Sequence, residues 1–243
     1  KAGPWALCPA SGPPLQKARL ESPQAHLPAR LRRTHLRALC ALVAVSILAA
    51  ASTQAAEPVV GGSCEGCEAI FDSRSAIPIR SGRISPEGAS GQPMLLFGVV
   101  SGPDGRPKSG AIVYGYQTNS AGIYEPDESA PSGAGRRHGR YRGWVQTDQD
   151  GRYEFKTVRP GGYPNSDLPE HIHLHVLEPG CATYYLEDAT FDDDPRLTEA
   201  KRREFANHRG GKGLSSPKRV LGVWQAQRNI TLGQSIPDYP GCK

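Results

Sequence analysis

The chain has 243 residues, of which 29 are Lys or Arg and 24 are Asp or Glu, so its formal net charge is +5. This surplus sits in residues 1–56, which hold seven basic residues and one acidic residue, so the remainder has a net charge of −1. A charge-balanced domain has no general attraction for nucleic acid, which excludes that class of partner.

Residues 1–56 have the layout of an upstream segment followed by an export signal. Residues 1–30 are rich in Pro and Ala, and a basic stretch then precedes an apolar run over 38–51 and a series of small residues. The apolar run is too short for a membrane span and lacks a stop-transfer flank. We therefore expect export to the periplasm or secretion, by the Sec or the twin-arginine route, with no stable membrane anchor after signal removal. A cytoplasmic protein with a chance apolar segment is the alternative.

The segment 57–93 is rich in Gly, Ser and Pro and is predicted to be an extended arm around the following domain. It contains Cys64 and Cys67, and Cys181 and Cys242 follow later. An even number of cysteines in an exported chain favours disulfides, although C-x-x-C is also typical of a redox or zinc half-site. No second C-x-x-C follows, so we predict structural disulfides. Three pairings remain open.

Residues 94–243 are predicted to form one mainly-β domain. Short runs of alternating apolar residues are separated by Gly, Pro and Asp turns, among them the turn with Asp148 and Asp150. Strands at this spacing indicate a sandwich or a barrel. One short helix is expected near 198–209, and the basic stretch 133–142 is expected to be a solvated loop.

The run PEHIHLHV, residues 169–176, places His171, His173 and His175 on alternate positions. Side chains alternate faces along a strand, so the three histidines share one face and the apolar residues between them form the core face. Residues two apart lie about 7 Å apart along a strand, so two imidazoles can reach one metal ion. A polar strand face in solvent is the alternative, and the neighbouring motifs have to decide.

Those neighbouring motifs resemble a known family. AGIY comes first, TDQDGRYEFKTVRPGGYP follows, and PEHIH comes last. This order is similar to that of the intradiol ring-cleavage dioxygenases, the family of the protocatechuate and catechol dioxygenases, over about Leu95–Phe191. The resemblance implies a single antiparallel β-sandwich with Greek-key-like connections. It also implies an enzyme that uses O₂ to cleave a catechol-type ring to a cis,cis-muconate-type product, and it leaves a homodimer open.

The resemblance further implies a mononuclear Fe(III) site and no organic cofactor. Carried over by motif, the metal ligands and catalytic residues are Tyr124, Tyr163, His171 and His173. A phenolate is a hard anionic donor that suits Fe(III), and a trivalent cation lowers the phenol pKa from its usual value of about 10. Two neutral imidazoles leave a coordination position for substrate. By resemblance, the bound catechol displaces Tyr124.

Two positions depart from the family pattern. Leu168 stands where the family commonly has an Arg that stabilises developing negative charge, and Asp188 stands where it has a Gln. Loss of the cation costs about a hundredfold in rate, unless Arg159 or Arg142 supplies the charge from another strand. The alternative function is therefore a non-catalytic iron- or catechol-binding β-sandwich module. A structural sandwich, or a zinc or copper site, is the weaker third reading.

Three more residues near these motifs need an assignment. Tyr114 and Tyr116 are rivals of Tyr124 for the role of tyrosine ligand. His175 lies on the ligand face but matches no family ligand, so we expect it beside the ligands or at the surface.

Overall fold

The computed structural model describes residues 57–73, 76–204 and 208–242. The upstream segment and export signal predicted at 1–56 lie outside these residues and stay predictions. No helix in the described part of the chain has the length and apolar character needed to cross a bilayer.

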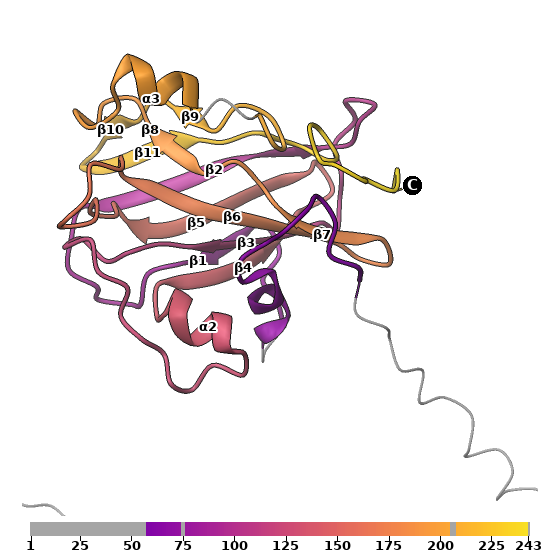
Figure 1. Ribbon diagram of the computed structural model, residues 1–243, viewed down its shortest axis with the longest axis horizontal. Coiled ribbons are helices and arrows are strands. Elements are labelled where there is room, and N and C mark those ends of the chain that lie inside the picture. Colours follow the sequence, from indigo (N-terminus) through magenta and orange to yellow (C-terminus); the bar gives the residue numbers. More distant parts are fainter. Residues whose placement is uncertain (1–56, 74–75, 205–207, 243) are drawn as a thin grey trace, which may run out of the picture. The chain divides into compact units, whose positions relative to one another are not determined.

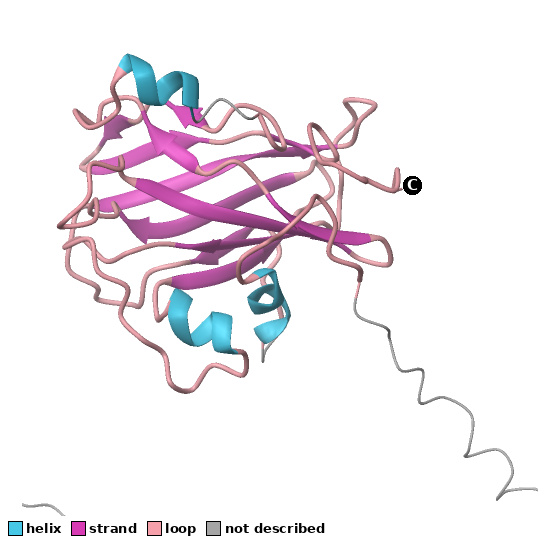
Figure 2. Ribbon diagram, viewed as in Figure 1, coloured by secondary structure: helices cyan, strands magenta, loops and turns pink. Residues whose placement is uncertain are grey.

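The described strands form two sheets that pack as a β-sandwich, which confirms the predicted fold class (Figures 1 and 2). The first sheet has the order β1 (Ser81–Arg83), β5 (Arg152–Val158), β2 (Pro93–Ser101), β11 (Val223–Gln227) and β10 (Lys218–Val220), with β12 (Ile230–Thr231) also paired with β2. The second has the order β4 (Arg142–Gln146), β3 (Ile112–Tyr116), β6 (His171–Glu178), β8 (Ala189–Phe191) and β9 (Leu214–Ser215), with β7 (Ala182–Tyr185) also paired with β6.

The pairing is antiparallel at the centre of each sheet and mixed toward its edges. The pairs β2–β5, β3–β4 and β3–β6 are antiparallel, although none of them is joined by a tight turn. In contrast, β1, β11, β12 and β9 each join a neighbour in parallel. The sandwich is therefore not purely antiparallel.

Alternation of side chains along the strands builds the core between the sheets. In β2 every second residue from Met94 to Val100 is buried, and in β6 the buried inner face carries Ile172, Leu174 and Val176. This confirms the predicted core face of the histidine strand. The odd-numbered residues of β6, including its three histidines, consequently lie on the opposite face of the second sheet.

Three short helices flank the described sandwich, with α2 and η1 on one side and α3 on the other (Figure 1). α3 (Glu199–Glu204) starts close to where the helix near 198–209 was expected. The expectation of a solvated loop at 133–142 is wrong, because this stretch contains α2 (Gly133–His138) and the start of β4. Ser132 caps α2 by accepting a hydrogen bond from the Gly135 N–H at 2.8 Å.

The segment 57–93 carries secondary structure of its own. It contains the 3₁₀ helix η1 (Cys67–Asp72), which packs beside α2 on the outer face of the second sheet, and strand β1. Val59 also forms a bridge with Thr183 of β7. The segment therefore covers the face of the sheet that bears the histidines.

Both disulfides predicted from the cysteine count are present. Cys64 is joined to Cys67 and Cys181 to Cys242. The Cys64–Cys67 bond closes a tight loop at the start of η1, whereas Cys181–Cys242 ties the turn between β6 and β7 to the C-terminal segment. Because both sulfurs of the C-x-x-C motif are joined, they are not thiolate ligands for zinc.

Candidate metal centre

Two imidazoles of β6 face each other on the outer side of the second sheet. The Nε2 atoms of His171 and His173 are 3.1 Å apart, and their rings meet edge to face. On the other side of each ring, His171 Nδ1 donates to the Pro169 carbonyl at 2.7 Å and His173 Nδ1 donates to the Asp188 carboxylate at 3.0 Å. A carbonyl and a carboxylate only accept, so these bonds place the proton of each neutral ring on Nδ1.

With the protons on Nδ1, the Nε2 atoms of His171 and His173 face each other without a hydrogen between them. When both rings are neutral, the two Nε2 lone pairs face each other at 3.1 Å, which is favourable only if a cation lies between them. Burial lowers the pKa of His171, so protonation of that ring is a poor solution. A metal ion satisfies both lone pairs at once.

Two tyrosine hydroxyls complete the group. The Tyr124 and Tyr163 hydroxyls share a hydrogen bond of 2.9 Å, and the Tyr163 hydroxyl lies 3.4 Å from His171 Nε2. Tyr124 comes from the loop between β3 and α2, and Tyr163 from the loop between β5 and β6. The structure thus brings together all four residues predicted as ligands, from three separate segments.

Glycines allow the two tyrosine loops to approach this closely. Gly122 has a φ of +80°, and a Cβ there would lie 2.2 Å from the Gly162 carbonyl oxygen. A Cβ on Gly161 would in turn lie 2.6 Å from both Gly122 N and Ser120 O. Larger residues would push the loops, and with them the two hydroxyls, apart.

Without a cation, the electrostatics of this group keep both tyrosine side chains as neutral phenols. Burial raises the pKa of both tyrosine hydroxyls, because a phenolate is poorly solvated there, and the Tyr163 hydroxyl raises the pKa of Tyr124 further through their hydrogen bond. A strongly charged hard cation reverses that balance and favours two phenolates. Two phenol oxygens and two imidazole nitrogens are a donor set that fits Fe(III).

Asp188 acts on this group through His173. Burial works to raise the pKa of Asp188, but the neighbouring His173 lowers it below its usual value, so the side chain is a carboxylate. It holds the His173 ring in the orientation that points Nε2 at His171. The sequence flagged Asp188 only as a departure from a family Gln, and this hydrogen bond could not be read from the sequence.

A cavity of about 430 Å³ opens beside these residues. Tyr163, His171 and His173 line it, whereas Tyr124 is not among the lining residues and joins the group through its bond to Tyr163. The opposite wall includes Ser63, Cys64 and Glu65 of the arm. Sequence reasoning missed this wall, since no local pattern indicates that a distant Gly- and Ser-rich segment folds against the histidine strand.

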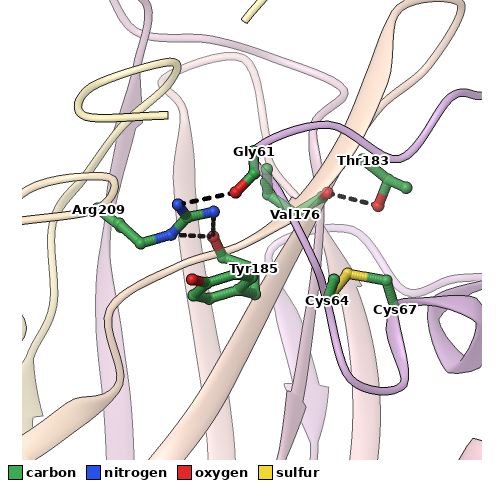
Figure 3. Close-up of a disulfide and its surroundings, with 7 residues drawn as sticks. All are labelled: Gly61, Cys64, Cys67, Val176, Thr183, Tyr185 and Arg209. Carbon is green, nitrogen blue, oxygen red and sulfur yellow. Dashed lines mark hydrogen bonds between the residues drawn. A yellow bond between two sulfur atoms is a disulfide. The ribbon is translucent and has the colours of Figure 1, made fainter. Parts of the chain in front are cut away.

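Hydrogen bonds fix the arm against the cavity wall (Figure 3). Arg209 donates to the Gly61 carbonyl at 3.2 Å and to the Tyr185 carbonyl at 3.3 Å. Its guanidinium also lies 3.6 Å from the centre of the Tyr185 ring, which lines the cavity. The Cys64–Cys67 disulfide then limits how far the loop can move.

The other three candidate residues, Tyr114, Tyr116 and His175, belong to a cluster of aromatic rings beside the four proposed ligands. Tyr116 pairs with His173 across β3 and β6, and its ring stacks between His173 at 4.5 Å and His138 at 3.6 Å. The Tyr114 hydroxyl is 2.9 Å from His138 Nδ1, so this tyrosine is engaged away from the four donor atoms. His175 is buried rather than at the surface, and burial lowers its pKa to about 3.

The arginines considered as substitutes for the family Arg lie elsewhere. Arg159 binds Glu170 and both carboxylate oxygens of Asp193, and Arg142 binds Asp72 and Asp127. Neither lines the cavity, whereas Leu168 does. The side chain at position 168 is thus apolar, and neither Arg159 nor Arg142 replaces the family Arg in the cavity.

The sequence of the chain is similar to those of known dioxygenases. The family model described as "Dioxygenase" matches residues 81–203, half of the chain. Catechol 1,2-dioxygenase 1 of Acinetobacter lwoffii is 42% identical over 109 residues, which cover 38% of this chain and 34% of that protein. The protocatechuate 3,4-dioxygenase alpha chain of Burkholderia cepacia is 32% identical over 155 residues, 63% of this chain and 68% of that one.

The fold has a counterpart among solved structures. The dioxygenase domain of a dioxygenase–carbohydrate-binding fusion from Streptomyces sp. SirexAA-E has a TM-score of 0.50 and 21% identity, covering 66% of this chain and 90% of that domain. The chain spans only 33–42% of the length of the catechol and 6-chlorohydroxyquinol dioxygenases among its relatives.

Proposed function

The chain belongs to the intradiol ring-cleavage dioxygenase family, and we propose that it holds one ferric ion and cleaves a catechol-type ring with O₂. The proposed ligands are Tyr124, Tyr163, His171 and His173. The observation that carries the proposal is the convergence of two hydroxyls and two Nε2 atoms beside a cavity large enough for a substituted catechol. The product is a ring-opened dicarboxylate of the cis,cis-muconate type.

A bound ferric ion would supply a Lewis acid that draws electron density from the catecholate and makes its ring reactive toward O₂. The protein residues prepare the substrate for this chemistry. A catechol has to lose two hydroxyl protons to bind as a dianion. Tyr124, whose oxygen lies 2.9 Å from that of Tyr163, would accept one of them as a phenolate, and the other would pass to water. His171 and His173 keep their orientation through the Nδ1 bonds to Pro169 and Asp188.

The walls of the cavity support selective entry of an aromatic ring. Leu168 and Tyr116 give it apolar surface that displaces water from around the ring. Leu168 also leaves the negative charge that develops during ring opening without a guanidinium at that position. We therefore expect turnover to be slow relative to a site that has such a cation.

The experiment is turnover of the iron-loaded protein with catechol under ¹⁸O₂. Oxygen uptake and a ring-opened product carrying two ¹⁸O atoms are the expected results. Leu168 favours a second candidate, a binding module that holds iron and a catechol without turnover. That candidate predicts a catechol-induced change in the visible spectrum without oxygen uptake for catechol or for any substituted catechol tested.

A further inference from the structure

The cavity beside the candidate metal centre is lined by acidic side chains but by no Lys or Arg among the described residues. The acidic side chains are those of Glu65, Glu187 and Asp188. Glu65 comes from the disulfide-closed loop of the arm, whereas Glu187 and Asp188 lie in the connection between β7 and β8. The carboxylates thus come to the same cavity from two separate segments.

The three carboxylates differ in their hydrogen-bond partners and in their exposure to solvent. Asp188 is engaged by His173, so its charge belongs to the metal centre. Glu187 is half-buried and accepts a hydrogen bond from the backbone N–H of His208, a neutral partner. Glu65 is exposed at the rim of the cavity. Glu65 and Glu187 therefore add negative potential to the space that a substituent of the ring would occupy.

Three arginines contact residues near the cavity but are not among its lining residues. Arg209 points to the Gly61 and Tyr185 carbonyls and lies against the Tyr185 ring. Arg228 is buried and donates to the carbonyls of Gly210 and Glu187. Arg196 packs against the backbone of Gly162 and does not line the cavity. Arg228 and His208 offset part of the charge of Glu187, whereas Glu65 has no Lys or Arg beside it among the described lining residues.

We propose that this cavity selects catechols by charge, excluding rings with a carboxylate substituent and favouring rings with a neutral or an ammonium-bearing substituent. The inference rests on the proposed function, because it concerns the substrate of the same centre. Glu65 and Glu187 are the specificity-determining residues. At separations of several Å in a partly hydrated cavity, two like charges lower the affinity for an anion by about tenfold or more, and raise that for a cation similarly.

The test uses three catechols of similar size whose side chains differ in charge: 4-ethylcatechol, 4-(2-aminoethyl)catechol and 3,4-dihydroxyphenylacetate. Each is titrated anaerobically into the iron-loaded protein, and binding is followed by the change in the visible charge-transfer band. We expect the ammonium compound to bind at least about tenfold more tightly than the carboxylate, with the neutral compound between them. The ratio should shrink as salt is added, because ions screen exposed charges.

Variants that remove one charge test whether Glu65 and Glu187 cause the difference in affinity between the ammonium and carboxylate compounds. Glu187→Gln and Glu65→Gln should each reduce the ratio by about threefold, and Leu168→Arg should raise the affinity for the carboxylate. Glu87→Gln is the matched control, since Glu87 is exposed, lies outside the cavity and changes the net charge by the same amount. It should leave the ratio unchanged.

Two results would overturn the inference in different ways. Equal affinities, or tightest binding of the carboxylate, would overturn charge selection while leaving the proposed function intact. A spectrum that none of the three compounds changes would remove the proposed function, and the inference with it.

Discussion

Asp188→Ala is expected to weaken iron binding without unfolding the protein. The Asp188 carboxylate accepts the Nδ1–H of His173 at 3.0 Å, and this bond fixes both the tautomer and the direction of Nε2. A hydrogen bond to a charged group contributes about 1.5–3 kcal/mol. Because the Asp188 side chain is 36% exposed, the lower half of that range applies, about 1.5–2 kcal/mol, or a 10- to 30-fold loss of affinity.

The assay is competition for Fe(III) with a chelator of known affinity, read by the visible band of the protein. Asp188→Asn keeps an acceptor oxygen but loses the charge, so its loss should be smaller, about threefold to tenfold. Asp150→Ala is the control for removal of a carboxylate, because Asp150 is a turn residue that is 70% exposed. An Asp188→Ala protein that binds iron as tightly as the wild type would refute the positioning role.

Three further predictions concern the scaffold. Asp72→Ala should lower the free energy of unfolding by about 3–5 kcal/mol in denaturant titrations, because it leaves the buried Arg142 guanidinium with one carboxylate fewer; a loss below 1 kcal/mol would contradict this. Burial lowers the pKa of His138 to about 3, so the unfolded chain binds the extra proton between pH 6.5 and 3, and stability should fall as the pH drops through that window. The fall should be shallower in His138→Phe, and an identical pH profile would count against the assignment. Cys181→Ser should lower the free energy of unfolding by about 2–4 kcal/mol, and Cys64→Ser should lower it less, because their disulfides span 61 and 3 positions. Equal losses would contradict the argument that a disulfide stabilises by restricting the unfolded chain.

The sequence predicted those features of the fold that depend on local periodicity. Alternation along β2 and β6 indicated strands and identified Ile172 and its neighbours as core, and the structure confirms both. The pairing partners were not predictable in the same way. The parallel attachment of β1 and β11 joins residues that are far apart in sequence, and nothing in a strand's own pattern specifies its neighbour.

The candidate site was predictable in its residues but not in its surroundings. Motif order selected the four candidate ligands, and the structure brings them together. The burial of His175 and the role of Glu65 depend on the arm folding over the outer face of the second sheet, a long-range contact. The error at 133–142 has the same origin. His138 and Arg142 are buried by contacts with Tyr116 and Asp72, which a basic stretch in the sequence does not indicate.

The central claim is that Tyr124, Tyr163, His171 and His173 hold one ferric ion, and a visible spectrum of the iron-loaded protein tests it most directly. A single site of this kind predicts one iron per chain. Tyrosinate bound to that iron predicts a charge-transfer band that colours the protein red-brown. Tyr163→Phe should shift or abolish that band, while Tyr185→Phe, a change to a cavity tyrosine outside the four donors, should leave it in place. A protein that takes up no iron, or whose band is unchanged in Tyr163→Phe, would contradict the account.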